Sequence, residues 1–493
     1  MKNIFKTSLI AFSVAALVSC GDDYLEEEPS EFLTIDQVAE AAETNPDVIA
    51  GTMNGIYALT VQTGTGGTTG HDDFGHKGYD IYADFLSGDM ALSVSTYGWY
   101  RANITEFIAL QDFTNTDNYQ VWRYYYRIIR SCNTVIDALG GNDVVPELAA
   151  NKAIMGQAKA MRAHSYFYLA QYMQKEYVAG EEILPIYTSL SGEAAAKSPA
   201  SEVYGLMEQD LLEAIDLLNG YQRGAKSEIN QNVAKGILAY VYGAMGRDGD
   251  AASLANQVVT SGEFTLMSDE EVTGGFNDLS TSGWMWGIDL TSDLEIDLVS
   301  WWGQMDAFSY SYAWAGDAKA IDAGLYAQIP DDDVRKAQFQ EPEDDYYDLM
   351  PLNKFYAPAR VIGGQRPMIT DLVYLRVAEM YLLAAEGSAK SGDEGTARTR
   401  LKQLVSQRVP DASYIDGLSG QALRNEIYLQ TRIELWGEGK SYLALKRNKA
   451  NVVRGANHLS FVGESIPYND ERLTFEIPQL EIQFNPLISS QND

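Results

Sequence analysis

Residues that could carry out catalysis are plentiful in this chain, but they do not fall at the spacings that enzymes use. The chain contains 69 Asp and Glu residues and four His residues, at positions 71, 76, 164 and 458. It contains no His-Glu-x-x-His motif for zinc and no Gly-x-Ser-x-Gly motif for a nucleophilic serine. Gly439-Lys440-Ser441 imitates the end of a phosphate-binding loop, but Glu434 stands where that loop needs Gly, and we expect a helix there.

Pairs of carboxylates leave one enzymatic alternative open, a glycoside hydrolase. Such an enzyme needs two carboxyl groups roughly 5–10 Å apart, one of them with a raised pKa. Among 69 acidic residues such a pair can occur by chance, so the count does not discriminate. The acidic runs at 331–333 and 341–345 are interpreted as solvated loops, with a weak calcium site as the alternative. We predict no metal and no cofactor.

Cys20 has the setting of a residue that is modified with lipid. Lys2 and Lys6 form a short basic start, residues 9–18 are apolar, and Leu17-Val18-Ser19-Cys20 follows. This pattern is typical of a secretory signal and is too short for a membrane span. Its end is similar to a bacterial lipobox. We therefore predict a signal peptide over residues 1–19 and a lipid on Cys20, with an ordinary signal peptide as the alternative.

Two further properties follow from the cysteine and charge content. If Cys20 carries lipid, Cys132 has no partner for an intramolecular disulfide and is expected to be a buried apolar residue. The formal charge of −33 argues against nucleic acid and anionic lipid surfaces as partners. Residues 20–34 are interpreted as an acidic, lipid-anchored linker. The run of acids there is also similar to a signal for export to the cell surface.

The remainder of the chain, residues 35–493, is predicted to form a single, mainly α-helical domain. Apolar residues recur at helical spacing in 153–172, 207–218, 233–244, 375–385 and 423–447. Gly246 and the Gly392-Asp393 pair mark tight turns between neighbouring helices. The pattern favours antiparallel hairpins of the tetratricopeptide type, although the strict 34-residue consensus is absent.

Two segments between the helical blocks differ from the rest. Residues 60–112 open with a Gly- and Thr-rich stretch, and residues 265–368 are rich in Trp, Tyr, Gly and Asp. Both are predicted to be long loops with short strands, inserted into the helical scaffold. Long irregular segments in a compact domain are often functional. The tail, 473–492, is predicted to be a short extended segment.

Motifs spread over nearly the whole chain resemble the SusD/RagB family of outer-membrane lipoproteins. They begin with Cys20 and its acidic linker and end with Asn485-Pro486 and Gln491-Asn492. Between these lie the motif segments 54–57, 122–133, 156–167, 232–242, 375–386 and 431–440. The late motif departs from the family pattern, because Lys440 replaces an Arg, and the segment before Arg408 lacks the usual Asn.

The resemblance implies a binding function outside the cell. Family members are lipid-anchored in the outer membrane and act as the lid of a SusC-like TonB-dependent transporter. They bind an extracellular nutrient, usually an oligosaccharide and in some cases a peptide, and are not enzymes. Their tetratricopeptide-like helices face the transporter, and their ligand site lies mainly on the less regular inserts.

A sugar site needs flat aromatic surfaces for the ring faces and planar polar groups for the hydroxyls. The inserts contain such residues where the family's ligand site falls, and the alternative for each is a place in the core. For Trp284 and Trp286, whose spacing predicts a strand, we expect one ring to face inward. The candidate ligand-binding residues are Asp72, Asp73, Tyr79, Trp99, Tyr100, Arg101, Asn103, Trp301, Trp302 and Tyr310. A surface hydrolase and an adhesin are the remaining alternatives.

Overall fold

The computed structural model describes residues 37–492 apart from 39, 42–44, 191–192 and 344. Cys20, the predicted signal peptide and the acidic linker lie outside the described residues. Within the described part, no helix is both long enough and apolar enough to cross a bilayer.

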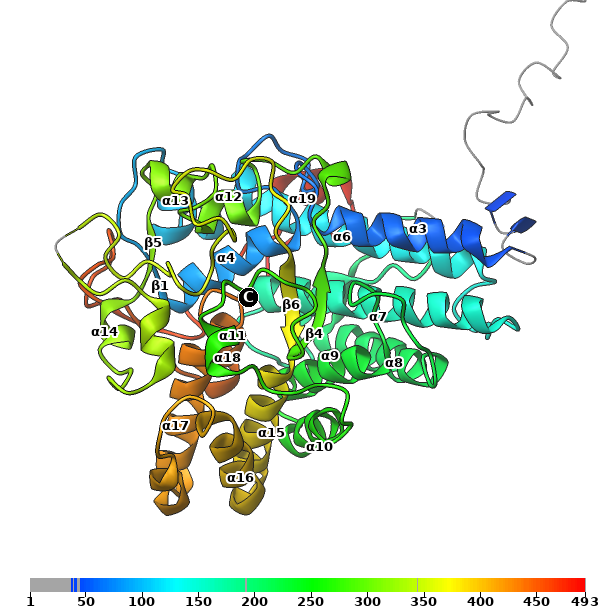
Figure 1. The fold of residues 1–493 in the computed structure, drawn as a ribbon. Coiled ribbons are helices and arrows are strands. Elements are labelled where there is room, and N and C mark those ends of the chain that lie inside the picture. Colours follow the sequence, from blue (N-terminus) through cyan, green and yellow to red (C-terminus); the bar gives the residue numbers. More distant parts are fainter. Residues whose placement is uncertain (1–36, 39, 42–44, 191–192, 344, 493) are drawn as a thin grey trace, which may run out of the picture.

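The scaffold consists of helices that pack against one another in succession (Figure 1). It runs from α3 through α6–α10 to α15–α18, and α10 packs against α15 across the second insert. Their bounds are α3 Pro46–Leu59, α6 Thr116–Ala138, α7 Ala149–Met173, α8 Ala200–Leu217, α9 Gln231–Ala244, α10 Asp248–Val259, α15 Val377–Ser391, α16 Glu394–Val405, α17 Gly420–Glu434 and α18 Ser441–Asn448. The predicted mainly helical, tetratricopeptide-like architecture is therefore confirmed.

The helices form where the apolar spacing predicts them, and their polar caps define their ends. Asn115 and Asn230 accept hydrogen bonds from backbone amides in the first turns of α6 and α9. Gly392 ends α15 with a φ of 95°, a conformation that favours glycine, and α16 begins two residues later. Cys132 lies fully buried in α6, as predicted for an apolar residue.

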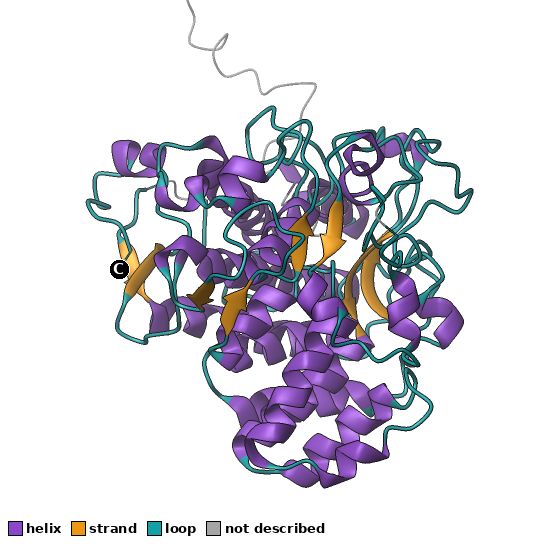
Figure 2. Ribbon diagram, turned by 90° about the vertical axis from the view of Figure 1, so that its left-hand side faces the viewer, coloured by secondary structure: helices purple, strands orange, loops and turns teal. Residues whose placement is uncertain are grey.

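Short antiparallel strand pairs tie the inserts to the scaffold (Figure 2). Strand β1 (Met90–Leu92) of the first insert pairs with β5 (Lys319–Ile321) of the second. Strand β4 (Trp284–Ile288) pairs with β6 (Leu372–Arg376), which leads directly into α15. The remaining pairs are β2 (Glu182–Pro185) with β3 (Lys197–Pro199) and β7 (Asn451–Val453) with β8 (Ser465–Pro467).

The first insert is not the run of loops and strands that we expected, because a buried helix lies in its middle. All twelve residues of α4 (His76–Ser87) are buried, including one His, one Lys and two Asp. It packs against α18 of the scaffold. Other short helical segments are η2 (Arg101–Thr105), α5 (Ile108–Gln111), α11 (Asp269–Val272), η3 (Ser292–Leu294), α12 (Trp301–Met305), α13 (Tyr312–Ala315), α14 (Ala323–Tyr326), η4 (Val334–Gln338), η5 (Ser413–Gly417), η6 (Glu471–Leu473) and α19 (Gln479–Phe484).

Two further expectations were wrong. The helix predicted over 423–447 is broken into α17 and α18 by a turn that contains Gly437 and Gly439. At Gly439, φ is 76° and a Cβ atom would lie 2.3 Å from Oδ1 of Asp80 in α4, so only glycine fits there. The segment that imitates a phosphate-binding loop is therefore partly a turn that packs on α4. The tail is not wholly extended, because it contains η6 and α19.

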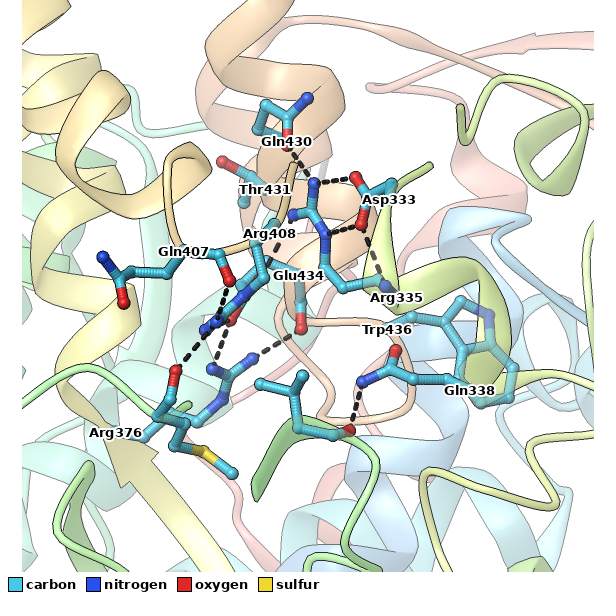
Figure 3. A network of polar contacts seen from close by, with 12 residues as sticks. Asp333, Arg335, Gln338, Arg376, Gln407, Arg408, Gln430, Thr431, Glu434 and Trp436 are labelled. Atoms are coloured by element: carbon cyan, nitrogen blue, oxygen red, sulfur yellow. Dashed lines mark hydrogen bonds and ion pairs between the residues drawn. The ribbon is translucent and has the colours of Figure 1, made fainter. Parts of the chain in front are cut away.

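A buried cluster of charges joins α17 to the segments around it (Figure 3). The Glu434 carboxylate is within 3.2 Å of guanidinium nitrogens of Arg335, Arg376 and Arg408. Arg376 also binds Glu438, at 2.7 Å. The three cations hold the pKa of the Glu434 carboxyl well below its usual range, although burial alone would raise it. The motif at residues 431–440 therefore stabilises the scaffold.

Candidate functional site

A pocket of about 630 Å³ opens at the rim of the first insert, beside the start of α6. Its lining comes from three places: the Gly- and Thr-rich loop, the segment 97–103 and the first residues of α6. The lining residues are Gly67, Thr68, Thr69, Gly70, Asp72, Tyr97, Gly98, Trp99, Tyr100, Asn103, Thr116 and Asp117. It includes no Lys or Arg from the described residues.

Aromatic rings form one side of this pocket. The Trp99 indole stacks on the His71 ring, with centroids 4.9 Å apart and an interplanar angle of 3°. The Tyr312 ring packs edge-on against both Trp99 and Tyr97, and its hydroxyl lies 2.5 Å from Nδ1 of His71. Tyr97 is 57% exposed and Trp99 is partly exposed. The cluster therefore presents aromatic surface to solvent while its inner members fix the rings.

Two carboxyl groups, Asp72 and Asp117, lie in the floor of the pocket and influence each other's pKa. Burial, and then the Asp72 charge, raise the pKa of Asp117 to about 8, and burial also raises the pKa of Asp72. Asp72 Oδ2 accepts a hydrogen bond from Tyr82 at 2.5 Å, and Asp117 Oδ2 accepts one from Asn103 at 2.7 Å. Asp117 is therefore protonated at neutral pH.

Local hydrogen bonds hold the rim of the pocket in place. Asp73 accepts bonds from the backbone amides of Gly66 and Thr68, at 2.7 and 2.9 Å, which closes the Gly- and Thr-rich loop. On the other side, Asp317 Oδ1 accepts bonds from the amides of Thr96 and Tyr97. A residue of the second insert thus positions a loop of the first.

Four of the predicted site residues line this one pocket, namely Asp72, Trp99, Tyr100 and Asn103. Their role in binding stays a prediction. Arg101 is exposed beside them and pairs with Glu106 at 3.3 Å.

Other predicted site residues are structural, because their side chains are buried. Asp73 closes the rim loop as described above, and Tyr79 is fully buried and donates to the carbonyl of Gln120. Trp301 and Trp302 are 3% and 0% exposed and pack edge-on against each other. Their assignment as ligand platforms is therefore wrong, since the helix α12 turns both rings into the core.

Three more aromatic residues of the second insert do not line the pocket. Tyr310 is 37% exposed, but it is not among the pocket's lining, and the Arg366 guanidinium lies 4.5 Å from its ring centre. Trp284 and Trp286 lie on the predicted strand, yet both rings are buried, whereas we expected only one to face inward. The sheet they belong to has core on both faces.

Sequence reasoning missed Tyr97 and Asp117. Asp117 is the second residue of α6, and an acidic residue there is usually explained by its favourable interaction with the helix N-terminus. Nothing in the neighbouring sequence therefore indicates that it lies near Asp72. Tyr97 lies two residues before Trp99, and Gly98 separates them. Two aromatic residues on either side of a glycine in a loop could have indicated a binding surface there.

The chemistry that this site can perform is recognition of hydroxyl groups and ring faces. Among the described residues, no group of three or more His, Cys, Asp or Glu side chains could hold a metal ion. In the acidic loops, Asp331 pairs with Lys336 and Asp333 with Arg335, so the calcium alternative gains no support there.

Comparison with known protein families gives two matches in this chain. Residues 76–242 match a family described as "Starch-binding associating with outer membrane", and residues 340–492 match the SusD family. Among curated proteins, SusD-like protein P25 of Formosa agariphila is 25% identical over 158 residues. That alignment covers 32% of this chain and 28% of the length of the relative.

Solved structures match over most of the chain. A SusD-like carbohydrate binding protein from Bacteroides vulgatus is 25% identical, with a TM-score of 0.73 over 90% of this chain and 96% of that one. A SusD superfamily protein from Bacteroides thetaiotaomicron is 24% identical, with a TM-score of 0.74 over 91% and 99% of the two chains. Surface glycan-binding protein A from Bacteroides uniformis is 19% identical, with a TM-score of 0.67 over 91% and 99%. The last two show a shared fold.

Proposed function

This chain belongs to the SusD/RagB family, and on that premise we propose that it is a cell-surface protein that binds an extracellular oligosaccharide in the pocket beside α6. The observation that carries this proposal is the combination of exposed aromatic rings, Tyr97 and Trp99, with a floor of hydrogen-bonding carboxyl groups. Ring faces of sugars pack on aromatic surfaces, and their hydroxyls exchange hydrogen bonds with planar polar groups.

The cellular role that we propose for it is that of a lid. In this role the protein is anchored to the outer membrane through lipid on Cys20, faces the cell exterior and delivers its ligand to a SusC-like TonB-dependent transporter. It performs no catalysis. Support comes from the family membership and from the signal-like first 20 residues. A test is co-purification of the full chain with its transporter from outer membranes.

The binding proposal is tested by titrating the full chain, purified in detergent, with a panel of neutral oligosaccharides and short peptides in a calorimeter. Trp99→Ala removes the stacked ring at the pocket and is expected to weaken oligosaccharide binding by at least about tenfold, or about 1.4 kcal/mol. Trp314→Ala is the matched control, because Trp314 is a partly exposed Trp (37%) that does not line the pocket.

Three outcomes would count against the proposal. Equal weakening by both substitutions would show that the effect is not local to the pocket. Binding of peptides without any oligosaccharide would reassign the ligand class. Appearance of shortened oligosaccharides after incubation would show an enzyme.

A further inference from the structure

A second groove, of about 610 Å³, runs along the outer side of α6, toward the C-terminal end of that helix. Its other side is formed by the helix α19 near the end of the chain and by Tyr187, Ser189, Glu193 and Ala194. Nothing in the oligosaccharide pocket described above uses these residues, since the two linings have no residue in common.

Three exposed arginines, Arg123, Arg127 and Arg130, follow one another along this groove. Their spacing of four and then three residues places them on one face of the helix, over about 10 Å. Among other exposed arginines, Arg101 and Arg366 have carboxylate partners, whereas Arg360 bonds the Leu352 carbonyl and the Asn353 amide oxygen. In the described part of the chain, no carboxylate lies within 4 Å of the three groove arginines; Arg123 bonds the Tyr119 hydroxyl and Arg127 the carbonyl of Thr65.

The charge of the groove is opposite to that of the molecule. Glu193 and Glu481 also line it, so its five charged side chains have a net formal charge of +1, whereas the whole chain has −33. Arginine binds carboxylate and sulfate groups through two parallel N–H donors, and it is weakly hydrated compared with lysine. The row of guanidinium groups is therefore suited to a ligand with several acidic groups.

Aromatic rings accompany the arginines. The Tyr126 ring packs against Trp122, with centroids 4.8 Å apart, and edge-on against Tyr187, at 5.8 Å. Across the groove, Phe484 of α19 is 80% exposed. Rings beside guanidinium groups offer apolar stacking and bidentate hydrogen bonding together, which a charged sugar can use and a simple inorganic anion cannot.

The groove adjoins the oligosaccharide pocket. The Arg123 side chain packs directly on Gly67, where a Cβ atom would lie 2.6 Å from Cδ of Arg123, and Gly67 lines the pocket. Arg127 contacts the same loop at Thr65, at 3.5 Å. Two groove arginines thus contact the loop that lines the oligosaccharide pocket, so the two hollows are neighbours.

We propose that this arginine groove is a second subsite that binds the acidic groups of a charged oligosaccharide, such as uronate carboxylates or sulfate esters. The proposal rests on the proposed function, because it assumes an oligosaccharide in the neighbouring pocket. The carboxyl pair of Asp72 and Asp117 makes that pocket unfavourable for an anion. The ligand therefore places an uncharged sugar over Trp99 and its acidic groups along α6.

The experiment measures binding of the full chain in detergent to polygalacturonate, alginate and chondroitin sulfate fragments, and to carboxyl-reduced, neutral polygalacturonate. At least one acidic fragment is expected to bind more tightly than the neutral one, with an affinity that falls as salt is raised. The substitution Arg130→Gln, at the groove arginine that bonds no residue of the Gly- and Thr-rich loop among the described residues, is expected to weaken acidic binding at least tenfold and to leave neutral binding unchanged. Arg424→Gln is the control, because Arg424 is a partly exposed arginine of α17 that bonds only Gln421 among the described residues.

Each result decides between the two proposals. If neutral fragments bind through Trp99 but no acidic fragment binds better, the arginine subsite is wrong and the proposed function stands. If no oligosaccharide binds at all, the proposed function fails as well. Equal binding of a poly-glutamate peptide of matched charge would overturn the sugar assignment and indicate a docking face for an acidic protein segment. Equal loss in the Arg424→Gln variant would overturn the location.

Discussion

At the scale of single residues, the carboxyl pair Asp72 and Asp117 has the most unusual chemistry of the site. A protonated Asp117 near Asp72 lets these carboxyl groups both donate and accept hydrogen bonds, which suits hydroxyl groups that do the same. Deprotonation of Asp117 would place a negative charge near the buried Asp72 carboxyl group. Because burial raises the pKa of Asp117 to about 8, that change falls just above neutral pH.

This titration predicts a pH-dependent stability. The folded chain holds a proton on Asp117 that the unfolded chain, with an ordinary pKa near 3.8, has lost at neutral pH. The resulting stability is fully present below pH 3.8 and is lost as pH rises to about 8. Asp117→Asn cannot titrate, so its melting temperature relative to the native chain is expected to increase from pH 5 to pH 9 by scanning calorimetry.

The matched control for this prediction is Asp216→Asn, at an exposed position of α8. The difference between this variant and the native chain should stay constant over the same pH range. A constant difference for Asp117→Asn as well would contradict the raised pKa of Asp117.

The sequence predicted part of this site, and the reason for the remainder lies in burial. Trp99 and Trp302 are both aromatic residues of an irregular insert, yet one lies at a rim and the other in the core. Residue type alone carries no information about which way such a ring turns. Asp117 could not be paired with Asp72 either, because 45 residues of chain separate them and only the fold brings them together.

At the scale of elements, the scaffold helices were predictable because one face of each packs on its neighbour. Apolar residues on that face recur at helical spacing in the sequence. Helix α4 was not predictable in this way. It is buried on every side, and its His76, Lys77, Asp80 and Asp84 each have a polar partner inside the molecule, so no apolar stripe marks it. The break between α17 and α18 was missed because the apolar spacing continues across Gly437 and Gly439.

Helix α17 supplies Glu434, the anion of the buried charge cluster. We predict that removing this carboxylate causes a large loss of stability. Glu434→Gln leaves three guanidinium groups without their common carboxylate, which is expected to lower the free energy of unfolding by about 3–5 kcal/mol. Asp416→Asn is the control, because the Asp416–Lys402 pair is exposed and is expected to contribute about 1 kcal/mol or less. Urea unfolding of both variants measures the two effects; similar midpoints would contradict the importance of the cluster.

At the scale of the whole molecule, the fold combines a helical scaffold with inserts that share its core. Most buried apolar residues of both form one continuous cluster, and a smaller cluster lies among α15, α16 and α17. The pocket is therefore built on segments that share one apolar core with the scaffold.

The attachment is testable with the two cysteines of the chain. Cys20→Ser removes the thiol that we expect to carry lipid, so the protein is expected to leave the membrane fraction of its host, as measured by fractionation and immunoblotting. Cys132→Ser is the matched control, because Cys132 is fully buried and contributes nothing to anchoring. Retention of the Cys20→Ser variant in the membrane fraction would contradict the predicted anchor.

The pocket combines Asp117 of a scaffold helix with Asp72 and a rim from the first insert, and this sets how new specificities can arise. Asp117 belongs to the scaffold helix α6, whose opposite face supports α3 and α7, so a change there disturbs inherited packing. Tyr97, Trp99 and the loop at Gly67–Gly70 sit on connecting segments that can be exchanged with little effect on the helices. Substitutions in the rim can therefore change the ligand specificity of related proteins while Asp117 in the scaffold helix stays the same.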